Sequence, residues 1–286
     1  MACTKNKDLG TILYSTTNDA SLNIVENLQK NWAWKKKNER LYTFSACGKS
    51  ECCTGFQAAG FEKSIIEIEP DYKAEFYLYA STHKSEKGTP ALTAHFPGNW
   101  GSADFGGNPK TLNTAYACKL KQILKLLDIG NKELGLNWEV NAEVDHHGPT
   151  PQDGNLPLIF VEIGSTQKEW VNPVAGKIVA SAMFKALIRP VEKFEAYIAF
   201  GGGHYAPAFG DYILGKKLLD GKEIAISHIC PKYRVDELDE SVILQAVKKT
   251  IEPVEGALID WKGLSQEQRE KIVSILDKEK IKWVRA

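Results

Sequence analysis

Short apolar runs alternate with amphipathic segments along most of the chain. Nearly continuous apolar runs at 158–163 and 196–200 predict strands that are buried on both faces of a sheet. Shorter runs predict strands at 10–14, 41–44, 65–68, 76–79, 224–229, 257–259 and 281–284. A polar, alternating run over 136–144 predicts one more strand, which ends in a Gly-Pro turn.

Apolar positions spaced three or four residues apart predict helices between these strands. The predicted helices cover 20–30, 111–128, 173–187, 212–219, 240–250 and 265–277. The apolar face of the first is expected at Leu22, Val25 and Leu28, and that of the second at Ala117, Leu120, Leu124 and Leu127. Alternating strands and helices predict an α/β fold with a mostly parallel sheet.

The 286 residues show no composition shift or linker, so the sequence predicts a single domain over 1–286. Residues 81–110 are polar and rich in glycine, with no clear period. Aromatic residues within this stretch, Phe96, Trp100 and Phe105, argue against disorder. A stretch of this length without secondary structure is expected to be a functional loop.

Composition narrows the classes of protein to consider. The chain has 36 basic and 36 acidic residues, which argues against general DNA binding but allows a local basic groove for an RNA end. No apolar run is long enough to cross a membrane, and residues 1–8 lack the apolar core of a secretory leader, so the cytoplasm is the expected compartment. Cys47, Cys52 and Cys53 form either a soft metal site or a set of reduced loop thiols.

The 6 histidines all lie at predicted strand ends or in glycine-rich loops. His146 and His147 follow Asp145 at the end of a predicted strand, and adjacent side chains on an extended segment point in different directions. Imidazole is a common zinc ligand, and a carboxylate can complete such a site. The expected zinc ligands are drawn from His95, His146, His147, Glu162 and His204. The alternative is that these are ordinary hydrogen-bonded histidines.

Further candidate residues surround these loops. The amides of Gly202 and Gly203 follow a predicted strand and suit an oxyanion, although a tight turn explains the same glycines. Aromatic and basic side chains near the loops suit base stacking and phosphate binding, or else the aromatics close the loops over the core. The candidate RNA-binding residues are Lys84, Lys87, Trp100, Lys110, Lys168 and Tyr205.

Four strings in order, STHKSEKGTPALTAHFPGNWG, HHGPT, FVEIGSTQKEW and AFGGGHYAP, resemble the archaeal and plant type of D-aminoacyl-tRNA deacylase. Asp145 stands where this family is expected to have a small polar residue, often Thr. The resemblance covers residues from about 10 onward. It implies a three-layer α/β/α sandwich like that of peptidyl-tRNA hydrolases and phosphorylases.

The resemblance also implies a zinc-dependent, monomeric hydrolase that frees D-amino acids from the 3′ end of tRNA. In this reading His83 donates a proton to the leaving ribose oxygen, while His146 and His147 serve as ligands or in acid-base chemistry. In an alternative mechanism, the terminal ribose hydroxyl of the tRNA promotes the reaction and the protein only positions it. Two other functions fit the same residues: a metal-dependent exopeptidase or amidohydrolase on small amides, and an RNA-end-binding module without catalysis.

Overall fold

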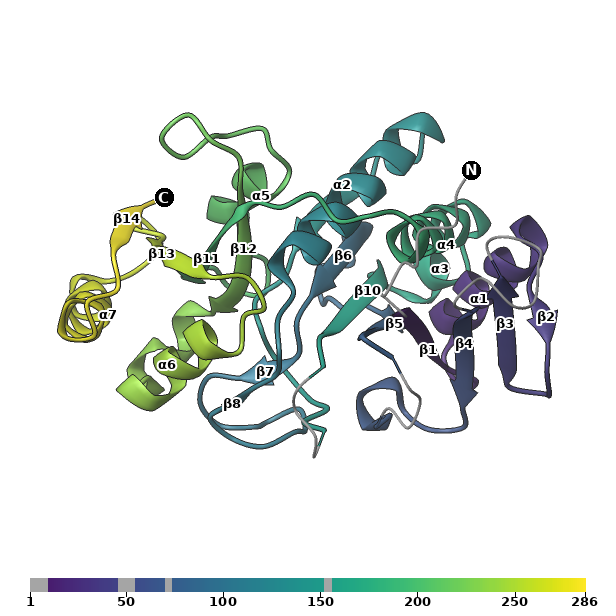
Figure 1. Cartoon of the computed structure of the whole chain (residues 1–286), viewed down its shortest axis with the longest axis horizontal. Helices are drawn as coiled ribbons and strands as arrows, with labels where there is room; N and C mark the ends of the chain where they lie inside the picture. The colour runs from purple at the N-terminus through teal and green to yellow at the C-terminus, as the bar shows by residue number, and fades with distance from the viewer. Residues whose placement is uncertain (1–9, 46–54, 70–73, 152–155) are drawn as a thin grey trace. The chain divides into compact units, whose positions relative to one another are not determined.

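The computed structural model describes residues 10–45, 56–69, 74–151 and 156–286, together with the backbone of Gly55 (Figure 1). The chain divides into two compact units. Unit 1 comprises 1–93, 126–140 and 156–190, and unit 2 comprises 94–125, 141–155 and 191–286. The chain passes between the units inside β6 (Ala91–His95), α2 (Ala117–Glu133) and β9 (Glu139–Ala142). These crossings carry no linker composition, which is why the sequence predicted one domain.

An eight-stranded sheet organises unit 1, in the order β2-β3-β4-β1-β5-β10-β6-β9. The strands not yet given are β1 (Gly10–Ser15), β2 (Lys35–Lys36), β3 (Leu41–Ser45), β4 (Gly55–Phe61), β5 (Phe76–Thr82) and β10 (Leu158–Gly164). The pairs β4-β1, β1-β5 and β5-β10 are parallel, whereas β2-β3 and β3-β4 are antiparallel. The prediction of a mixed, mostly parallel sheet is therefore confirmed.

Helices α1 (Asp19–Asn31) and α4 (Pro173–Ile188) pack on each other and on this sheet. Both begin at an asparagine: the Asn18 side chain accepts a hydrogen bond from the amide of Ser21, and Asn172 caps α4 in the same way. Val25 and Leu28 are buried as predicted, but Leu22 is 36% exposed, and Ile24 takes its place in the core. The short α3 (Gln167–Trp170) lies between β10 and α4 in the chain.

Unit 2 contains a second sheet of four parallel strands, in the order β12-β11-β13-β14. Its strands are β11 (Glu195–Phe200), β12 (Ile224–Cys230), β13 (Val254–Ile259) and β14 (Trp283–Arg285). Its helical elements are α5 (Pro207–Ile213), η2 (Lys232–Glu237), α6 (Glu240–Lys248) and α7 (Gln266–Lys278), besides the first half of α2. A small two-stranded sheet joins β7 (Gly98–Asn99) to β8 (Thr111–Leu112).

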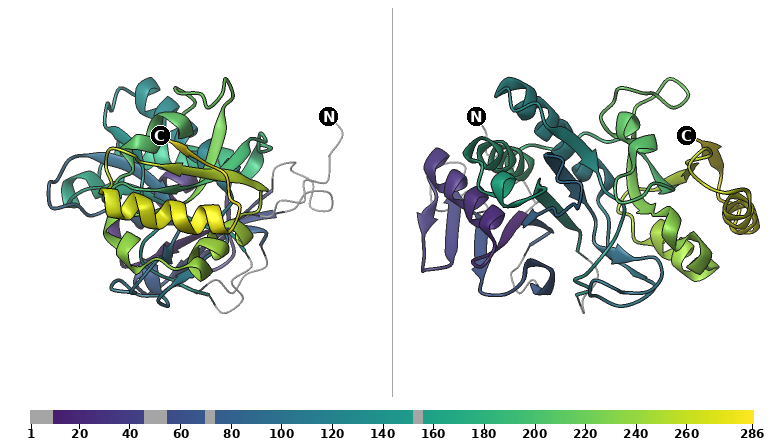
Figure 2. Two further views of the ribbon diagram at one scale, coloured as in Figure 1. Left: turned by 90° about the vertical axis from the view of Figure 1, so that its left-hand side faces the viewer. Right: turned by 180° about the vertical axis from the view of Figure 1, so that it is seen from behind.

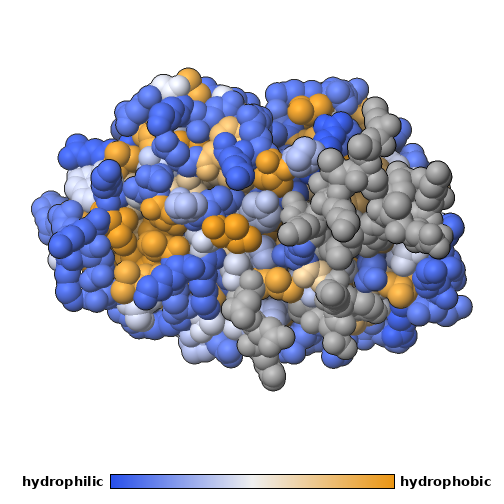
Figure 3. Space-filling model, viewed as in Figure 1, coloured by the Kyte–Doolittle hydropathy of each residue, from blue (hydrophilic) through white to orange (hydrophobic). Residues whose placement is uncertain are grey.

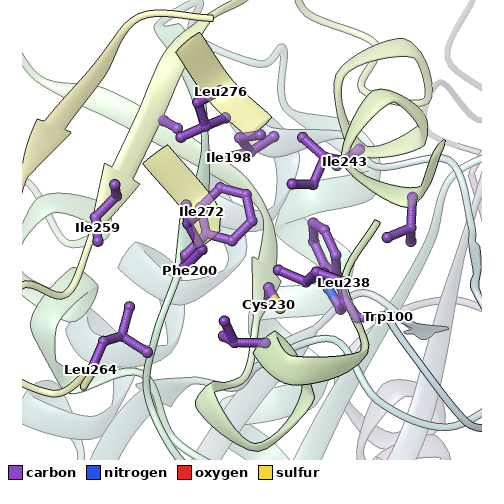
Figure 4. Close-up of a cluster of buried hydrophobic side chains, with 14 of the residues drawn as sticks. Trp100, Ile198, Phe200, Cys230, Leu238, Ile243, Ile259, Leu264, Ile272 and Leu276 are labelled. Atoms are coloured by element: carbon purple, nitrogen blue, oxygen red, sulfur yellow. The ribbon is translucent and has the colours of Figure 1, made fainter. Parts of the chain in front are cut away.

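Helical elements cover both faces of this second sheet. Ile198 and Phe200 of β11 pack with residues of α6 and α7, among them Ile243 and Ile272 (Figure 4). Ala196 instead packs with Ala117 and Cys118 of α2, and α5 contacts β12. The register shifts along β11 place an extra residue in β12, between Ile226 and Ile229, and another in β13, between Val254 and Gly256. In the left view of Figure 2, α7 faces the viewer in yellow.

Most predicted elements are present, and a few differ in type or in their ends. Residues 65–68 form a 3-10 turn, η1 (Ile65–Glu67), rather than a strand. The predicted functional loop at 81–110 contains β6 and β7. Helix α2 begins at Ala117 rather than near Thr111, because the carboxylate of Glu252 accepts hydrogen bonds from its first amides, at 3.0 Å from Ala117 and 2.7 Å from Cys118. The α-helix predicted at 212–219 is α5, which ends at Ile213.

The surface seen in Figure 3 is mostly hydrophilic, with apolar residues in small groups between charged ones. Within the described ranges, no helix has the length and apolar character needed to span a membrane. Cys47, Cys52 and Cys53 lie outside the described residues, as does the segment 1–8.

Candidate active site

The segment 143–147, which directly follows β9, is the centre of the site in unit 2. Backbone hydrogen bonds fix this segment. The amide of Glu143 donates to the carbonyl of Ala94 (3.2 Å), that of Val144 to the carbonyl of His204 (3.1 Å) and that of Asp145 to the carbonyl of Ile229 (2.9 Å). These bonds join the segment to the end of β6, to the loop after β11 and to β12. Side chains that are far apart in the sequence therefore meet around it.

His95, His146 and His147 form a cluster of imidazoles there. The ring centroids are 4.4 Å apart for His95 and His146, 4.9 Å for His95 and His147, and 4.5 Å for the adjacent pair. Adjacent histidines on an extended strand were expected to diverge. They converge because His147 adopts a left-handed backbone conformation, with φ of 54°. One potential ligand atom from each residue lies within 4.8 Å of the others.

The hydrogen bonds of these rings fix which nitrogen faces the cluster. The Nδ1 atom of His95 lies 3.0 Å from the carbonyl oxygen of Phe96, and that of His146 lies 2.8 Å from the carbonyl of Val144. Nδ1 of His147 contacts the carbonyl of Gly148 in the same way. A carbonyl oxygen only accepts, so each Nδ1 donates its proton, and in the neutral form of such a ring Nε2 keeps a lone pair. Metal-bound histidines have the same arrangement.

Burial favours the neutral form of two of these imidazoles, those of His95 and His147. It lowers the pKa of His95 to about 3, with a further contribution from the neighbouring His146. Burial and the same neighbour also lower the pKa of His147 well below its usual value. Neutral imidazoles are the form that binds a metal ion.

Glu143 is a candidate site residue that the sequence did not single out. Its carboxylate is buried, and its Oε2 lies 2.7 Å from Nε2 of His204 and 3.6 Å from Nε2 of His146. Burial alone would lower the pKa of His204, but the hydrogen bond and charge of Glu143 outweigh it and raise this pKa. The signal in the sequence was a glutamate three residues before a histidine pair, which is too common to be specific.

Asp145 and His228 form a second buried pair beneath the cluster. Nδ1 of His228 lies 2.6 Å from Oδ2 of Asp145, and the amide of Ile229 donates to Oδ1 at 3.1 Å. Burial raises the pKa of Asp145, while the contact with His228 opposes that shift. Asp145 thus anchors the segment that carries His146 and His147 to β12. His228 was not among the site residues that the sequence predicted.

In unit 1, His83 and Glu162 lie together. Oε2 of Glu162 is 4.0 Å from Nδ1 of His83 and 3.4 Å from the hydroxyl of Thr93, and all of these side chains are buried. A Cβ atom at Gly164 would come within 2.5 Å of Cδ2 of His83, so the absence of a side chain there lets the ring approach β10. This placement makes Glu162 a partner for His83.

The structure also places the predicted oxyanion and RNA contacts. The amide of Gly203 donates to the carbonyl of Tyr205 at 3.1 Å, an arrangement that fits a tight turn. Gly202 has φ of 87°, which also fits a turn. Trp100 is 1% exposed and packs in the core of unit 2, so it closes its loop over the core as the alternative expected (Figure 4).

Among the basic candidates, Lys84, Lys87 and Lys168 are exposed in unit 1. Lys110 is in unit 2 and forms an ion pair with Asp239 at 2.6 Å. Tyr205 is half-buried beside the ring of His204, with centroids 5.9 Å apart.

An α/β fold that presents clustered imidazoles and a buried carboxylate at strand ends has donor atoms that could hold a metal ion, as the sites of many hydrolases do. Comparison with known proteins gives the family. Residues 70–284 match the family model described as D-aminoacyl-tRNA deacylase. The chain belongs to the D-aminoacyl-tRNA deacylase family, as the resemblance of its motifs predicted.

Individual relatives agree with this assignment. The chain is 34% identical to the D-aminoacyl-tRNA deacylase of Thermococcus onnurineus, over 96% of this chain and 98% of that protein. It is 34% identical to the protein of the same name from Pyrococcus furiosus, over 91% and 93% of the two chains. A crystal structure described as a conserved protein of unknown function superposes with a TM-score of 0.80 and 25% identity, covering 99% of this chain and 96% of that one.

Proposed function

We propose that this protein hydrolyses the ester bond between a D-amino acid and the 3′ end of tRNA, releasing both. Family membership supports the substrate, and the cluster of His95, His146 and His147 supports the chemistry. The observation that carries the proposal is that each of these rings has Nδ1 beside a backbone carbonyl, the orientation that metal-binding histidines adopt.

We propose zinc as the cofactor, because neutral imidazole nitrogens are ligands that this ion favours. The residues present fit it: His95, His146 and His147 would hold the ion, and Glu143 and His204 lie next to them. When bound, such an ion supplies Lewis-acid activation of water and of the ester carbonyl.

The side chains themselves supply proton transfer. The raised pKa of His204 favours the protonated imidazole, which is the form that can protonate a leaving oxygen. Glu143 then holds the ring in place through the 2.7 Å contact. His83 remains a second candidate for this proton, with Glu162 as its partner in unit 1. We propose Glu162 as the partner of His83 and also as a candidate zinc ligand.

The decisive experiment compares hydrolysis of D- and L-aminoacyl-tRNA by the purified protein, before and after treatment with a chelator, with metal content measured in parallel. We expect release of the D-amino acid, preference over the L-substrate and loss of activity with the metal. If metal-free protein stays active, zinc is not the cofactor, but the proposed hydrolysis still holds. If the metal-loaded protein hydrolyses no substrate, the proposed hydrolysis is wrong.

We also propose that the protein works as a monomer in the cytoplasm, where charged tRNA is used. Light scattering of the purified protein tests the first part, and a mass twice that of one chain would contradict it.

A further inference from the structure

Unit 2 carries a groove that the proposed reaction does not use. It has a volume of about 370 Å³ and is lined by Trp261, Gln266, Arg269, Glu270, Val273 and Trp283. These residues come from α7, from β14 and from the turn after β13, and none of them belongs to the imidazole cluster. A volume of roughly 300 to 1,000 Å³ is typical of small-molecule sites, so the groove has room for a nucleotide-sized group.

Two tryptophans form an aromatic wall in this groove. The rings of Trp261 and Trp283 are parallel to within 3°, with centroids 5.8 Å apart. Both side chains are only partly buried, although the cores of folded proteins usually take up residues of this size. The indole nitrogen of Trp283 donates to Asp277 at 2.9 Å, which fixes the orientation of this ring. The wall therefore offers flat apolar surface in a set geometry.

Guanidinium groups lie against this wall. Cζ of Arg285 is 3.9 Å from the centroid of the Trp261 ring, and Cζ of Arg269 is 5.0 Å from it. Arg269 is held by hydrogen bonds to the carbonyls of Trp261 and Leu264, each of 2.7 Å. Planar cations beside aromatic faces are the combination with which proteins hold single-stranded nucleic acid, since the rings stack bases and the cations meet phosphates.

The local charge agrees with a polyanionic partner. The whole chain has 36 basic and 36 acidic residues, but in the segment 261–286 lysine and arginine outnumber aspartate and glutamate. Lys262, Lys280 and Lys282 are all exposed in this segment. The acidic residue in the lining, Glu270, can accept a hydrogen bond from the edge of a base, as can the side chain of Gln266.

We infer that this groove binds RNA by stacking an unpaired base on the Trp261–Trp283 wall, with Arg285 and the neighbouring lysines on the flanking phosphates. The inference rests on the proposed function for the identity of the RNA, which is the tRNA body rather than its aminoacylated end. The aminoacyl ester must reach the imidazole cluster, whose residues differ from those of the groove. A second contact on the same tRNA raises its effective concentration at the reactive site without taking part in the reaction.

Binding of uncharged tRNA tests the groove directly, by filter binding and by quenching of tryptophan fluorescence. Trp283→Ala and Arg285→Gln in the full chain should each weaken binding, the first by about 5- to 100-fold if one stacked base is lost. Trp283→Phe should restore much of the affinity, because it keeps an aromatic face. Trp138→Ala and Arg40→Gln, which remove a tryptophan and an exposed arginine from unit 1, should bind as the wild type does.

Kinetics separate a contact on the tRNA body from a defect of the reactive site. With D-aminoacyl-tRNA, Trp283→Ala should raise KM and leave kcat unchanged. With a D-amino acid esterified to a short CCA oligonucleotide, the same variant should match the wild type in both. Equal losses on the two substrates, or wild-type affinity for uncharged tRNA in both groove variants, would overturn the inference.

The two proposals fail in different ways. If the wild type binds uncharged tRNA through the groove but hydrolyses no charged tRNA, the proposed reaction is wrong and the groove stands. If the wild type hydrolyses D-aminoacyl-tRNA while the groove variants equal it in binding and kinetics, only the groove is wrong. Thermal denaturation of each variant shows whether a loss of binding comes with a loss of fold, and Arg285→Gln, at an exposed position, should keep the wild-type midpoint.

Discussion

Nε2 of His204 lies 2.7 Å from Oε2 of Glu143, although the two residues are far apart in the sequence. The carboxylate is fully buried, while the imidazole is partly exposed. The pair thus joins a buried anion to a ring that solvent and substrate can reach. The properties of His204 therefore depend on Glu143.

The first prediction concerns the pKa of His204. In the metal-free wild type we expect the ring to titrate above its usual pKa of 6.5. In Glu143→Gln the raising interaction is removed and burial remains, so the pKa should fall below that value. NMR titration of the histidine ring protons measures both. An unchanged pKa in the variant would show that Glu143 does not control this imidazole.

The same shift has a consequence for stability. Because the folded pKa of His204 is raised, the pair contributes its full stability below the unfolded pKa of histidine. That contribution is lost as pH rises through the folded pKa. The difference in unfolding free energy between wild type and Glu143→Gln should therefore shrink across that range as pH increases.

The second prediction separates the metal ligands from the proton donor. Replacing His95, His146 or His147 by alanine should remove both bound zinc and activity, because each would lose one Nε2 ligand. His204→Ala should keep its zinc and lose rate by about 100- to 10,000-fold, as expected for a general acid-base residue. Metal analysis and single-turnover deacylation on the same samples measure the two effects. Zinc retained in all three ligand variants would show that the cluster is not the metal site.

The third prediction concerns the approach of His83 to β10. Gly164→Ala would place a methyl group 2.5 Å from the ring of His83, so the ring must shift from its present position beside Glu162. If His83 takes part in proton transfer, the rate should fall by up to about 100-fold. Gly210→Ala is the matched control, because no atom lies within 4 Å of its added methyl group. Single-turnover rates equal to wild type in Gly164→Ala would exclude a catalytic part for His83.

The fourth prediction concerns the buried pair of Asp145 and His228. Removing one partner of a buried hydrogen bond typically costs about 1 to 3 kcal/mol, because the other partner is left unsatisfied, so Asp145→Asn should lower the unfolding free energy by an amount of this order. The control is the exposed Arg40–Glu62 ion pair, where Glu62→Gln should lower the unfolding free energy by less than about 1 kcal/mol. Urea denaturation measures both. A loss in Asp145→Asn no larger than that in Glu62→Gln would contradict the anchoring role.

The periodic elements of the fold could be predicted from sequence because they depend on local pattern. The apolar run of β10 and the helix that begins at Pro173 are found where they were expected. The start of α2 could not be predicted, since its cap comes from Glu252, far along the chain. Strand β4, with its small residues GFQAAGF, lacks the bulky apolar pattern that marks a strand.

The candidate site also has features that local sequence pattern predicts and features that it does not. The sequence singled out His95, His146 and His147, because clustered histidines at strand ends are rare enough to notice. It did not find Glu143, whose role depends on a hydrogen bond with His204, nor the bend at His147 that turns two adjacent rings toward each other. Pairwise geometry of this kind depends on tertiary contacts that no local pattern records.

The passage of the chain between the units inside β6, α2 and β9 also affects synthesis. β5 pairs with β10, and residues 94–125 and 141–155 of unit 2 are made between them. As the chain emerges from the ribosome, one edge of β5 stays unpaired until β10 has been made. Residues 94–125 and 141–155 have by then left the ribosome, but their partners in 191–286 have not been synthesised. N-terminal domains generally fold first during synthesis, but here neither unit has all its segments until well into the second half of the chain. Chaperones that shield exposed strand edges are therefore expected to matter more for this protein than for one whose units are continuous in sequence.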